Sequence, residues 1–523
     1  KLAAQGKYRE ALQLIKRENP FPAVCGRVCN RRCEDACTRG RVDAAVAIDE
    51  VKKFIAQRDL DAATRYVPPV VTPTRAGGFD QKIAIIGAGP AGLSCAFYLA
   101  EKGYKPVVFE KNERPGGMLT YGIPSFKLQK DVIEAEVEVI RLMGAEFRYG
   151  VEVGRDVTLD ELRAQGFKAF YVAIGCQGGR LAGIPGEDAE DVTVAVDFLR
   201  EVNSGKIDAL PGRTIVVGGG NVAIDVARNA CRLGSEHVEM FCLESEAQMP
   251  ASEEERREAI EDGAHISCGW GPKEVHLDET GRVCGITFKR CTRVFDDEGR
   301  FAPEYDENDL RRVDADRVVM SIGQSIVWGD LLAGSKVELG RGQGALADPQ
   351  TYQTAEPDIF VGGDVYTGPS FAIDAIAAGH EAAVSIHRFV QPGSTLTIGR
   401  NQRRYTALDR DDVVIESYDN ASREVAHVDR EREKAAPFSE YVETFTEEQV
   451  RAETARCLGC GASIVDPNKC IGCGLCTTKC AFDAIHLDRD RPECSTMVKY
   501  EQKLPSLGKY ALKRAIKIKF GRK

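Results

Sequence analysis

The sequence lacks the features that mark membrane, secreted and nucleic-acid-binding proteins. No apolar run is long enough to span a bilayer, and no signal peptide is recognisable. Basic residues are not in excess: the formal charge is −10 and the isoelectric point is about 5.5, which argues against a nucleic-acid partner. These absences predict a cytoplasmic protein. Because the chain begins at Lys1 rather than Met, we also expect residues upstream of it.

The chain of 523 residues also lacks the uniform cysteine density of a small disulfide-stapled domain. Its 18 cysteines fall mainly into two groups, one in residues 25–37 and one in residues 457–480. Ordinary α/β sequence separates the groups. This clustering predicts metal binding in a reducing compartment rather than disulfide pairing.

The order strand, glycine turn, helix, strand begins near Lys82 and again near Arg213, which predicts two dinucleotide-binding folds. The expected fold class is α/β, with two interleaved Rossmann-like domains flanked by a helical N-terminal domain and a small ferredoxin-like domain. The basic tail is expected to be a solvated end, a docking site for an acidic partner or a membrane-surface contact. The predicted boundaries are 1–65 for the helical iron–sulfur domain, 80–195 and 335–392 for the FAD-binding domain, 196–334 for the NAD(P)H-binding domain, 393–450 for a connector, 451–495 for the ferredoxin-like domain and 496–523 for the tail.

The first glycine loop lies between an apolar strand at 83–86 and an apolar helix at 93–100. Its first glycine permits a tight turn, its second lets the backbone approach a pyrophosphate, and its third lets helix and strand pack closely. The next strand ends in an acid that can accept ribose hydroxyls. A mere tight turn is the alternative. The predicted contacts are Gly87, Gly89, Pro90, Ala91, Gly92, Glu110 and Lys111.

Two further turns are expected to contact the same cofactor, which we predict to be FAD. A Gly-Gly-Met turn at 116–118 can wrap its backbone over the cofactor, or it is a surface turn. A Gly-Asp pair at 363–364 follows a later strand, where the acid can bind a ribityl hydroxyl or cap a helix. The predicted contacts are Gly116, Gly117, Met118, Gly175, Gly363 and Asp364.

The second glycine loop has the pattern GxGxxA, and its following strand leads to Leu243 and Glu244. An NADP site usually carries arginine there to meet the 2′-phosphate. Glu244 would repel that phosphate and accept a ribose hydroxyl, so NAD(H) is predicted over NADP(H), unless Glu244 points into solvent and another residue decides. The predicted contacts are Gly218, Gly220, Asn221, Val222, Ala223 and Glu244.

No catalytic acid or base is predicted, because hydride transfer between nicotinamide and flavin needs stacking and orientation. Cys95 and Cys176 lie in apolar segments without C-x-x-C partners, which favours buried core cysteines over a redox disulfide. A disulfide reductase is disfavoured because no C-x-x-C occurs between Lys82 and His387.

The C-terminal cysteines at 470–480 have the C-x2-C-x2-C-x3-C spacing of bacterial ferredoxins, which predicts a [4Fe-4S] cluster, with zinc as the alternative. The last cysteine of such a run can serve a second cluster, so Cys480 could join Cys457 and Cys460. Cys470, Cys473 and Cys476 would then need one more ligand, for which Cys494 is a candidate.

The N-terminal cysteines are spaced by four, and Pro22 and Gly26 favour an irregular loop over one helix face. A cluster is predicted there, with zinc or chance as alternatives. The predicted ligands are Cys25, Cys29, Cys33, Cys37, Cys457, Cys460, Cys470, Cys473, Cys476 and Cys480. They supply at least two [4Fe-4S] clusters. Three or four stay open, because a third needs Cys494, a non-cysteine ligand or residues upstream of Lys1.

Together these motifs resemble the glutamate synthase small-subunit family over most of residues 1–390. Relatives of that family include the large subunit of NADH-dependent ferredoxin:NADP oxidoreductase and the N-terminal half of dihydropyrimidine dehydrogenase. The resemblance implies a glutathione-reductase-like fold, FAD at the first loop, a nicotinamide dinucleotide at the second, cubane clusters in the N-terminal domain and electron relay to a partner. It rests on GRVC at 26–29, GGMLTYGIP at 116–124, GIPGED at 183–188, GGGNVA at 218–223 and MPA at 249–251.

Three departures from the family matter. The paired arginines common in the family are replaced by Leu243 and Glu244. Its Arg-Cys-Leu-x-Cys segment, which normally precedes the N-terminal domain, occurs here at 456–460. The appended ferredoxin-like module favours a ferredoxin, hydrogenase or other redox partner over a glutamate synthase large subunit.

We therefore expect an NAD(H)-linked electron-transfer subunit that works with FAD and clusters alongside ferredoxin or other redox subunits, and electron bifurcation stays open. One alternative is a small subunit that supplies a glutamate synthase large subunit. Another is a scaffold that docks clusters without flavin chemistry.

Overall fold

The computed structural model describes residues 1–71, 78–391, 393–398, 400, 415, 418–460, 465, 470–480, 485–487 and 499–520. It divides into two units, Lys1–Cys460 and Gly461–Lys523, and each is described by itself.

The first parallel sheet has the strand order β15-β4-β1-β2-β3. Strand β1 is buried from Ile83 to Ile86 because helices cover the sheet, and α13 packs along α5. The strands are β1 (Lys82–Ile86), β2 (Val107–Glu110), β3 (Glu146–Tyr149), β4 (Phe167–Val172) and β15 (Ile359–Val361). The helices are α5 (Pro90–Glu101), α6 (Met118–Tyr121), α7 (Lys130–Leu142), α8 (Leu159–Ala164), α12 (Asp364–Thr367) and α13 (Ala372–Val390).

The second parallel sheet has the order β6-β13-β7-β8-β9, and an antiparallel sheet, β10-β11-β12, is inserted between β9 and β13. The strands of the second parallel sheet are β6 (Val192–Val194), β7 (Arg213–Val217), β8 (His237–Cys242), β9 (His265–Cys268) and β13 (Arg317–Met320). The insert consists of β10 (Trp270–Leu277), β11 (Val283–Phe295) and β12 (Phe301–Val313). The helices are α9 (Ala195–Asn203), α10 (Asn221–Arg232) and α11 (Glu253–Glu261).

The two sheets are interleaved along the chain. The chain leaves the first sheet after β4, builds the second, and returns through β15, which pairs in parallel with β4. The short strands β5 (Gly178–Gly179) and β14 (Gln324–Ser325) pair with each other where the chain passes between the sheets. This arrangement confirms the predicted α/β fold class with two interleaved dinucleotide-binding domains.

The N-terminal domain is helical, and a distant segment of the chain completes it. Residues from α1, α4 and α15 share one apolar core, in which Phe445 and Val450 pack against Tyr8 and Phe54. Sequence reasoning, which described 393–450 as a connector, did not anticipate this packing. The elements are η1 (Ala3–Gln5), α1 (Tyr8–Lys16), α2 (Pro22–Val28), α3 (Arg32–Asp35), η2 (Thr38–Arg41), α4 (Ile48–Gln57), α14 (Arg430–Ala435) and α15 (Glu447–Ala455).

In the second unit the described helices are α16 (Leu475–Lys479) and α17 (Tyr500–Phe520). Among the residues that the structure describes, no helix is both long and apolar enough to cross a membrane.

Candidate functional site

The first glycine loop joins β1 directly to the N-terminus of α5. Gly87 has a φ of 102°, and a Cβ there would collide with the carbonyl oxygen of Ala173, which directly follows the neighbouring strand β4. A Cβ on Gly92 would overlap the carbonyl oxygen of Gly87, so only glycine allows α5 to pack this close. Gly89, by contrast, has nothing within 4 Å of such a position. The loop therefore leaves open space at the helix N-terminus, where backbone amides favour an anion.

Glu110 ends β2 and organises this loop. Its Oε2 accepts a hydrogen bond from the backbone N–H of Ala88 at 2.8 Å, and its Oε1 accepts one from the backbone N–H of Asn112 at 2.9 Å. The side chain is only 3% exposed. The carboxylate thus fixes the loop conformation; its predicted contact with a ribose stays a prediction.

Two other predicted turns meet this loop. The Gly116 N–H donates to the Ala88 carbonyl at 2.7 Å, and a Cβ on Gly117 would come within 2.9 Å of the Gly89 Cα. Asp364 begins α12 just after β15, and burial raises the pKa of its carboxyl group to about 6. The sequence-predicted segments therefore converge in the folded chain.

A cavity of about 990 Å³ lies over these turns and is large enough for a dinucleotide cofactor. It reaches both glycine loops, because the start of α10 also lines it. The predicted contacts that line it are Gly87, Gly89, Pro90, Ala91, Glu110, Lys111, Gly117, Met118, Gly175, Gly363, Asp364, Asn221 and Val222. The volume of the cavity fits FAD. So do the glycines of the loops, where a Cβ atom would collide with neighbouring backbone.

The second glycine loop repeats the first with one change. A Cβ on Gly218 would collide with the Ser321 carbonyl oxygen, and Gly220 again faces open space. Ala223 is fully buried at the position that Gly92 holds in the first loop. The Glu244 carboxylate lies above Gly219, where a Cβ would be 2.9 Å from its Oε2. Glu244 therefore lies at the glycine loop rather than pointing away from it.

The four N-terminal cysteines lie in two short helices and just after each of them, so they do not share one helix face. Cys25 is in α2 within the apolar core, and burial raises the pKa of its thiol to about 12. Cys29 follows α2 and lines the large cavity. Cys33 is exposed in α3, and Cys37 precedes η2.

The C-terminal cysteines belong to both units. Cys457 and Cys460 end the first unit and line a second cavity of about 400 Å³. In the second unit, Cys470 and Cys473 are exposed before α16, where Gly472 has a φ of 67°. Cys476 lies in α16, Cys480 follows it, and Cys494 lies outside the described residues.

Over the described part of the chain, no three cysteine, histidine, aspartate or glutamate side chains converge closely enough to hold a metal ion. The fit of iron–sulfur clusters therefore rests on donor chemistry, namely clustered thiols at ferredoxin spacing and beside cavities. The individual ligand assignments stay predictions.

A charged group that sequence reasoning missed closes one wall of the large cavity. Lys127 of the first domain forms an ion pair with Asp225 of α10 at 2.6 Å and another with Glu255 of α11. Burial raises the pKa of Asp225 to about 6. The Lys-Leu-Gln and Asp-Val-Ala contexts of Lys127 and Asp225 carry no motif, so no local signal identifies the contact.

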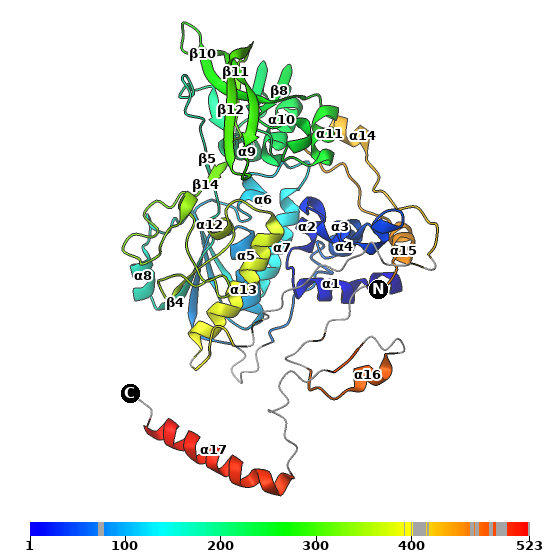
Figure 1. Cartoon of the computed structure of the whole chain (residues 1–523), viewed down its shortest axis with the longest axis vertical. Coiled ribbons are helices and arrows are strands. Elements are labelled where there is room, and N and C mark those ends of the chain that lie inside the picture. The colour runs from blue at the N-terminus through cyan, green and yellow to red at the C-terminus, as the bar shows by residue number, and fades with distance from the viewer. Residues whose placement is uncertain are drawn as a thin grey trace. The chain divides into compact units, whose positions relative to one another are not determined.

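Residues 428–442, which we term the strap, line the same cavity and join two domains (Figure 1). The Tyr441 hydroxyl accepts a hydrogen bond of 2.7 Å from the buried guanidinium of Arg228 on α10. Glu440 forms an ion pair of 3.0 Å with Arg27 of α2. The strap thus fastens the second dinucleotide domain to the N-terminal domain.

The predicted character of Cys95 and Cys176 is confirmed, since both are buried. The Cys176 thiol donates to the Asp364 carbonyl at 3.7 Å, and burial raises its pKa to about 12. Neither thiol is in an environment that favours the reactive thiolate.

Three family models match the chain. The model for the pyridine nucleotide-disulphide oxidoreductase matches residues 81–379. The model for dihydropyrimidine dehydrogenase domain II, 4Fe-4S cluster, matches residues 1–64. The model for a 4Fe-4S binding domain matches residues 463–486.

Characterised relatives match over most of the chain. It is 34% identical over 490 residues to the NADP(+)-dependent formate dehydrogenase subunit beta of Moorella thermoacetica, covering 87% of this chain and 67% of that one. It is 35% identical over 412 residues to the glutamate synthase [NADPH] small chain of Escherichia coli, covering 75% and 85%. Among solved structures, FprA of Mycobacterium tuberculosis in complex with NADPH has a TM-score of 0.51 at 20% identity, covering 60% of this chain and 84% of that one. This last likeness concerns the fold alone.

Proposed function

We propose that this chain uses NADH as its nucleotide. The premise is that the chain belongs to the pyridine nucleotide-disulphide oxidoreductase family and to its glutamate synthase small-subunit-like branch. The chain is an electron-transfer subunit that depends on FAD and [4Fe-4S] clusters. Its relatives are subunits of larger redox enzymes, so we further propose ferredoxin or another redox subunit as its partner. The clustered thiols support a reducing compartment, the cytoplasm.

The observation that carries the proposal is the shared cavity. Its lining includes Gly89 of the first loop, Asn221 at the start of α10 and the cysteine Cys29. A dinucleotide, a flavin and a cluster ligand can therefore meet in one space. When bound, FAD supplies the exchange between a hydride, which carries two electrons, and single electrons.

The chain's own residues bind and orient. The N-termini of α5 and α10 direct backbone amides to the two pyrophosphates, and Gly117 leaves room for a cofactor over Gly89. The ion pair between Lys127 and Asp225 holds the two dinucleotide domains together at the cavity wall. No side chain needs to move a proton for this transfer.

The preference for NADH rests on Glu244. The names of both relatives specify NADP(H), but this chain has Leu243 and Glu244 after β8. A carboxylate above the glycine loop repels a 2′-phosphate and accepts a 2′-hydroxyl. Steady-state rates with NADH and NADPH test the choice, and a higher kcat/KM for NADPH would contradict it.

The function is tested by anaerobic titration of the purified protein with NADH, in wild type and in a Cys470→Ser/Cys473→Ser variant. We expect the flavin absorption band to bleach in both proteins, and reduction of ferredoxin to fall at least about tenfold in the variant. A flavin band that does not respond to either nucleotide would contradict the proposal. Glutamate formation from glutamine and 2-oxoglutarate, on adding a glutamate synthase large subunit, would instead favour the alternative function.

A further inference from the structure

Two cysteines of the second parallel sheet place their sulfur atoms next to each other. Cys242 ends β8 and Cys268 ends the edge strand β9, and the two residues are direct partners in the parallel register. Their Sγ atoms are 3.7 Å apart. Neither belongs to the cysteine groups at 25–37 and 457–480, so the proposed electron relay makes no use of them.

The backbone geometry of this pair suits a disulfide. Adjacent strands of a sheet lie about 4.8 Å apart, and direct partners on them have their side chains on the same face. Disulfides bridge Cα atoms that are roughly 4.4–6.8 Å apart. The sulfur atoms of Cys242 and Cys268 can therefore bond after side-chain rotation, with little movement of either strand.

The pair lies at the second glycine loop, beside the acid to which we assign the choice of nucleotide. A Cβ on Gly219 would be 2.9 Å from the Cys242 Cβ and 3.5 Å from its Sγ, so this cysteine packs against the loop. The Glu244 carbonyl accepts a hydrogen bond from the Gly269 N–H at 3.0 Å and lies 3.6 Å from the Cys242 sulfur. The turn that carries Glu244 is thus fastened to the ends of both strands that carry the thiols.

The two thiols differ in their access to solvent. Cys242 is only 2% exposed, and burial raises the pKa of its thiol above the ordinary value. It therefore keeps its proton, which it donates to the Cys268 sulfur or to the Glu244 carbonyl. Cys268 is partly exposed at the edge of the sheet. A small oxidant in solution consequently meets Cys268 first, and Cys242 is the thiol beside it that can form the second bond.

We propose that Cys242 and Cys268 are a redox modification site, at which a hydroperoxide forms a reversible disulfide that weakens nucleotide binding at the second glycine loop. The Cys268 sulfur takes one peroxide oxygen and becomes a sulfenic acid, while the O–O bond breaks and an alcohol leaves. The Cys242 sulfur then bonds to Cys268, and the oxygen leaves as water with the Cys242 proton. Two thiols thereby lose two electrons and two protons to one peroxide molecule.

The inference deepens the proposed function, on which it rests, by adding regulation at the nucleotide site. Transient disulfides in a reducing compartment are typical of redox sensors. When the disulfide forms, Cys242 no longer has a proton to donate, and the Glu244 carbonyl keeps only the Gly269 N–H. Loss of one hydrogen bond at this turn predicts that the NADH concentration for half-maximal flavin bleaching rises about fivefold.

The test compares the full-length protein, purified anaerobically with flavin and clusters bound, before and after treatment with cumene hydroperoxide. Trypsin separates the two cysteines at Arg256 and Arg257, so mass spectrometry can detect a peptide in which Cys242 and Cys268 are joined. We expect this peptide to appear together with the higher NADH requirement, and dithiothreitol to reverse both. Absence of the joined peptide, or its presence with an unchanged NADH requirement, would overturn the proposal.

Matched variants separate the site from peroxide damage to the clusters, with iron content measured alongside. Cys268→Ser keeps both cysteine groups but cannot form the disulfide, so its NADH requirement should not respond to the peroxide. Cys291→Ser removes a neighbouring thiol, which donates to the Arg293 carbonyl at 3.4 Å, and should respond as wild type does. An equal response of wild type and Cys268→Ser, or no response of Cys291→Ser, would overturn the assignment.

The same experiment distinguishes failure of this proposal from failure of the proposed function. If NADPH rather than NADH bleaches the flavin, the proposed nucleotide is wrong, and the disulfide is judged by the NADPH requirement instead. A joined peptide that accompanies a higher NADPH requirement in wild type, but not in Cys268→Ser, would then still support the modification site.

Discussion

The two dinucleotide-binding folds share a strand, a glycine loop and a helix, but they differ in how completely the chain encloses them. Helix α5 of the first fold has ten buried residues out of twelve, because α13 covers it, whereas α10 of the second has seven. The acid after the second strand differs likewise, since Glu110 is buried with two backbone partners and Glu244 is partly exposed. The difference indicates a permanent cofactor in the first fold and an exchangeable one in the second.

The largest effect is expected from exchanging the third residue of the glycine motif between the two folds, which is Gly92 in the first and Ala223 in the second. Gly92→Ala places a methyl group against the Gly87 carbonyl, so we expect about 3 kcal/mol of destabilisation and a flavin-free protein. The reciprocal Ala223→Gly should cost only about 1 kcal/mol through helix propensity and keep the flavin. Flavin-to-protein ratios and urea unfolding measure both variants. Full flavin content in Gly92→Ala would contradict the proposed difference between the two folds.

Glu110→Gln removes the charge of the buried carboxylate that ends β2 in the first fold. Replacing one carboxylate oxygen by an amide N–H loses a charge-assisted hydrogen bond to a backbone donor, so we expect flavin affinity to fall about tenfold. Flavin fluorescence released on dilution measures it. Glu113→Gln, an exposed neighbour, serves as control and should bind flavin as wild type does. Equal release from the two variants would assign no role to the buried carboxylate.

Glu244→Gln probes the corresponding acid of the second fold. Removing its charge should raise the ratio of kcat/KM for NADPH to that for NADH by about fivefold, because the repulsion of a 2′-phosphate is lost. Flavin content should not change, which separates the two folds. The exposed Glu246→Gln is the matched control. An unchanged ratio would mean that another residue selects the nucleotide.

Tyr441→Phe is expected to have the smallest effect and sharpens the comparison at the strap. It removes one hydrogen bond to Arg228, which keeps its ion pair with Asp262, so we expect about 1 kcal/mol of destabilisation. Tyr149→Phe removes a bond of equal length, 2.7 Å, to Arg141, whose side chain is 31% exposed, and should have less effect. Thermal unfolding measures both. A larger effect of Tyr149→Phe would contradict the importance of burial at the strap.

The fold and the first site could be predicted because local sequence encodes them. Gly87 and Gly92 are required by contacts within a few residues or with the adjacent strand, and Glu110 ends the next strand. These constraints produce a pattern with fixed spacing, which a single sequence reveals. The family and the α/β fold class predicted from them are confirmed.

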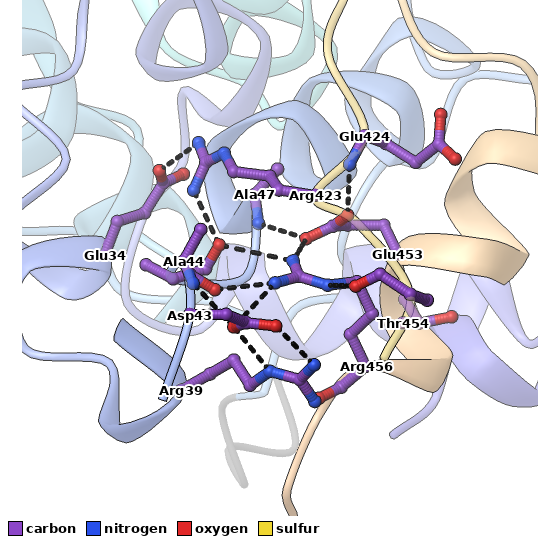
Figure 2. A network of polar contacts seen from close by, with 12 residues as sticks. Glu34, Arg39, Asp43, Ala44, Ala47, Arg423, Glu424, Glu453, Thr454 and Arg456 are labelled. Atoms are coloured by element: carbon purple, nitrogen blue, oxygen red, sulfur yellow. Dashed lines mark hydrogen bonds and ion pairs between the residues drawn. The ribbon is translucent and has the colours of Figure 1, made fainter. Parts of the chain in front are cut away.

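The contacts that sequence reasoning missed are non-local and polar. Arg456 and Arg39 appear in the sequence as ordinary surface charges, yet both are buried because each also contacts the segment that carries the other, at the far end of the unit (Figure 2). Lys127 and Asp225 likewise meet only when two domains pack. Periodicity reports which face of an element is apolar, and it carries no information on which distant charge pairs with which.

The hydrogen bond between Arg39 and the backbone carbonyl of Arg456 has a consequence for biosynthesis. Arg39 and the carbonyl that it binds are 417 residues apart in the chain, and the core around Tyr8 and Phe54 also needs Phe445 and Val450. At typical elongation rates, the N-terminal helices wait roughly 20–80 s on the ribosome before these partners emerge. The N-terminal helices are therefore completed only after both dinucleotide-binding domains have been translated, and until then their apolar surface is a substrate for chaperones.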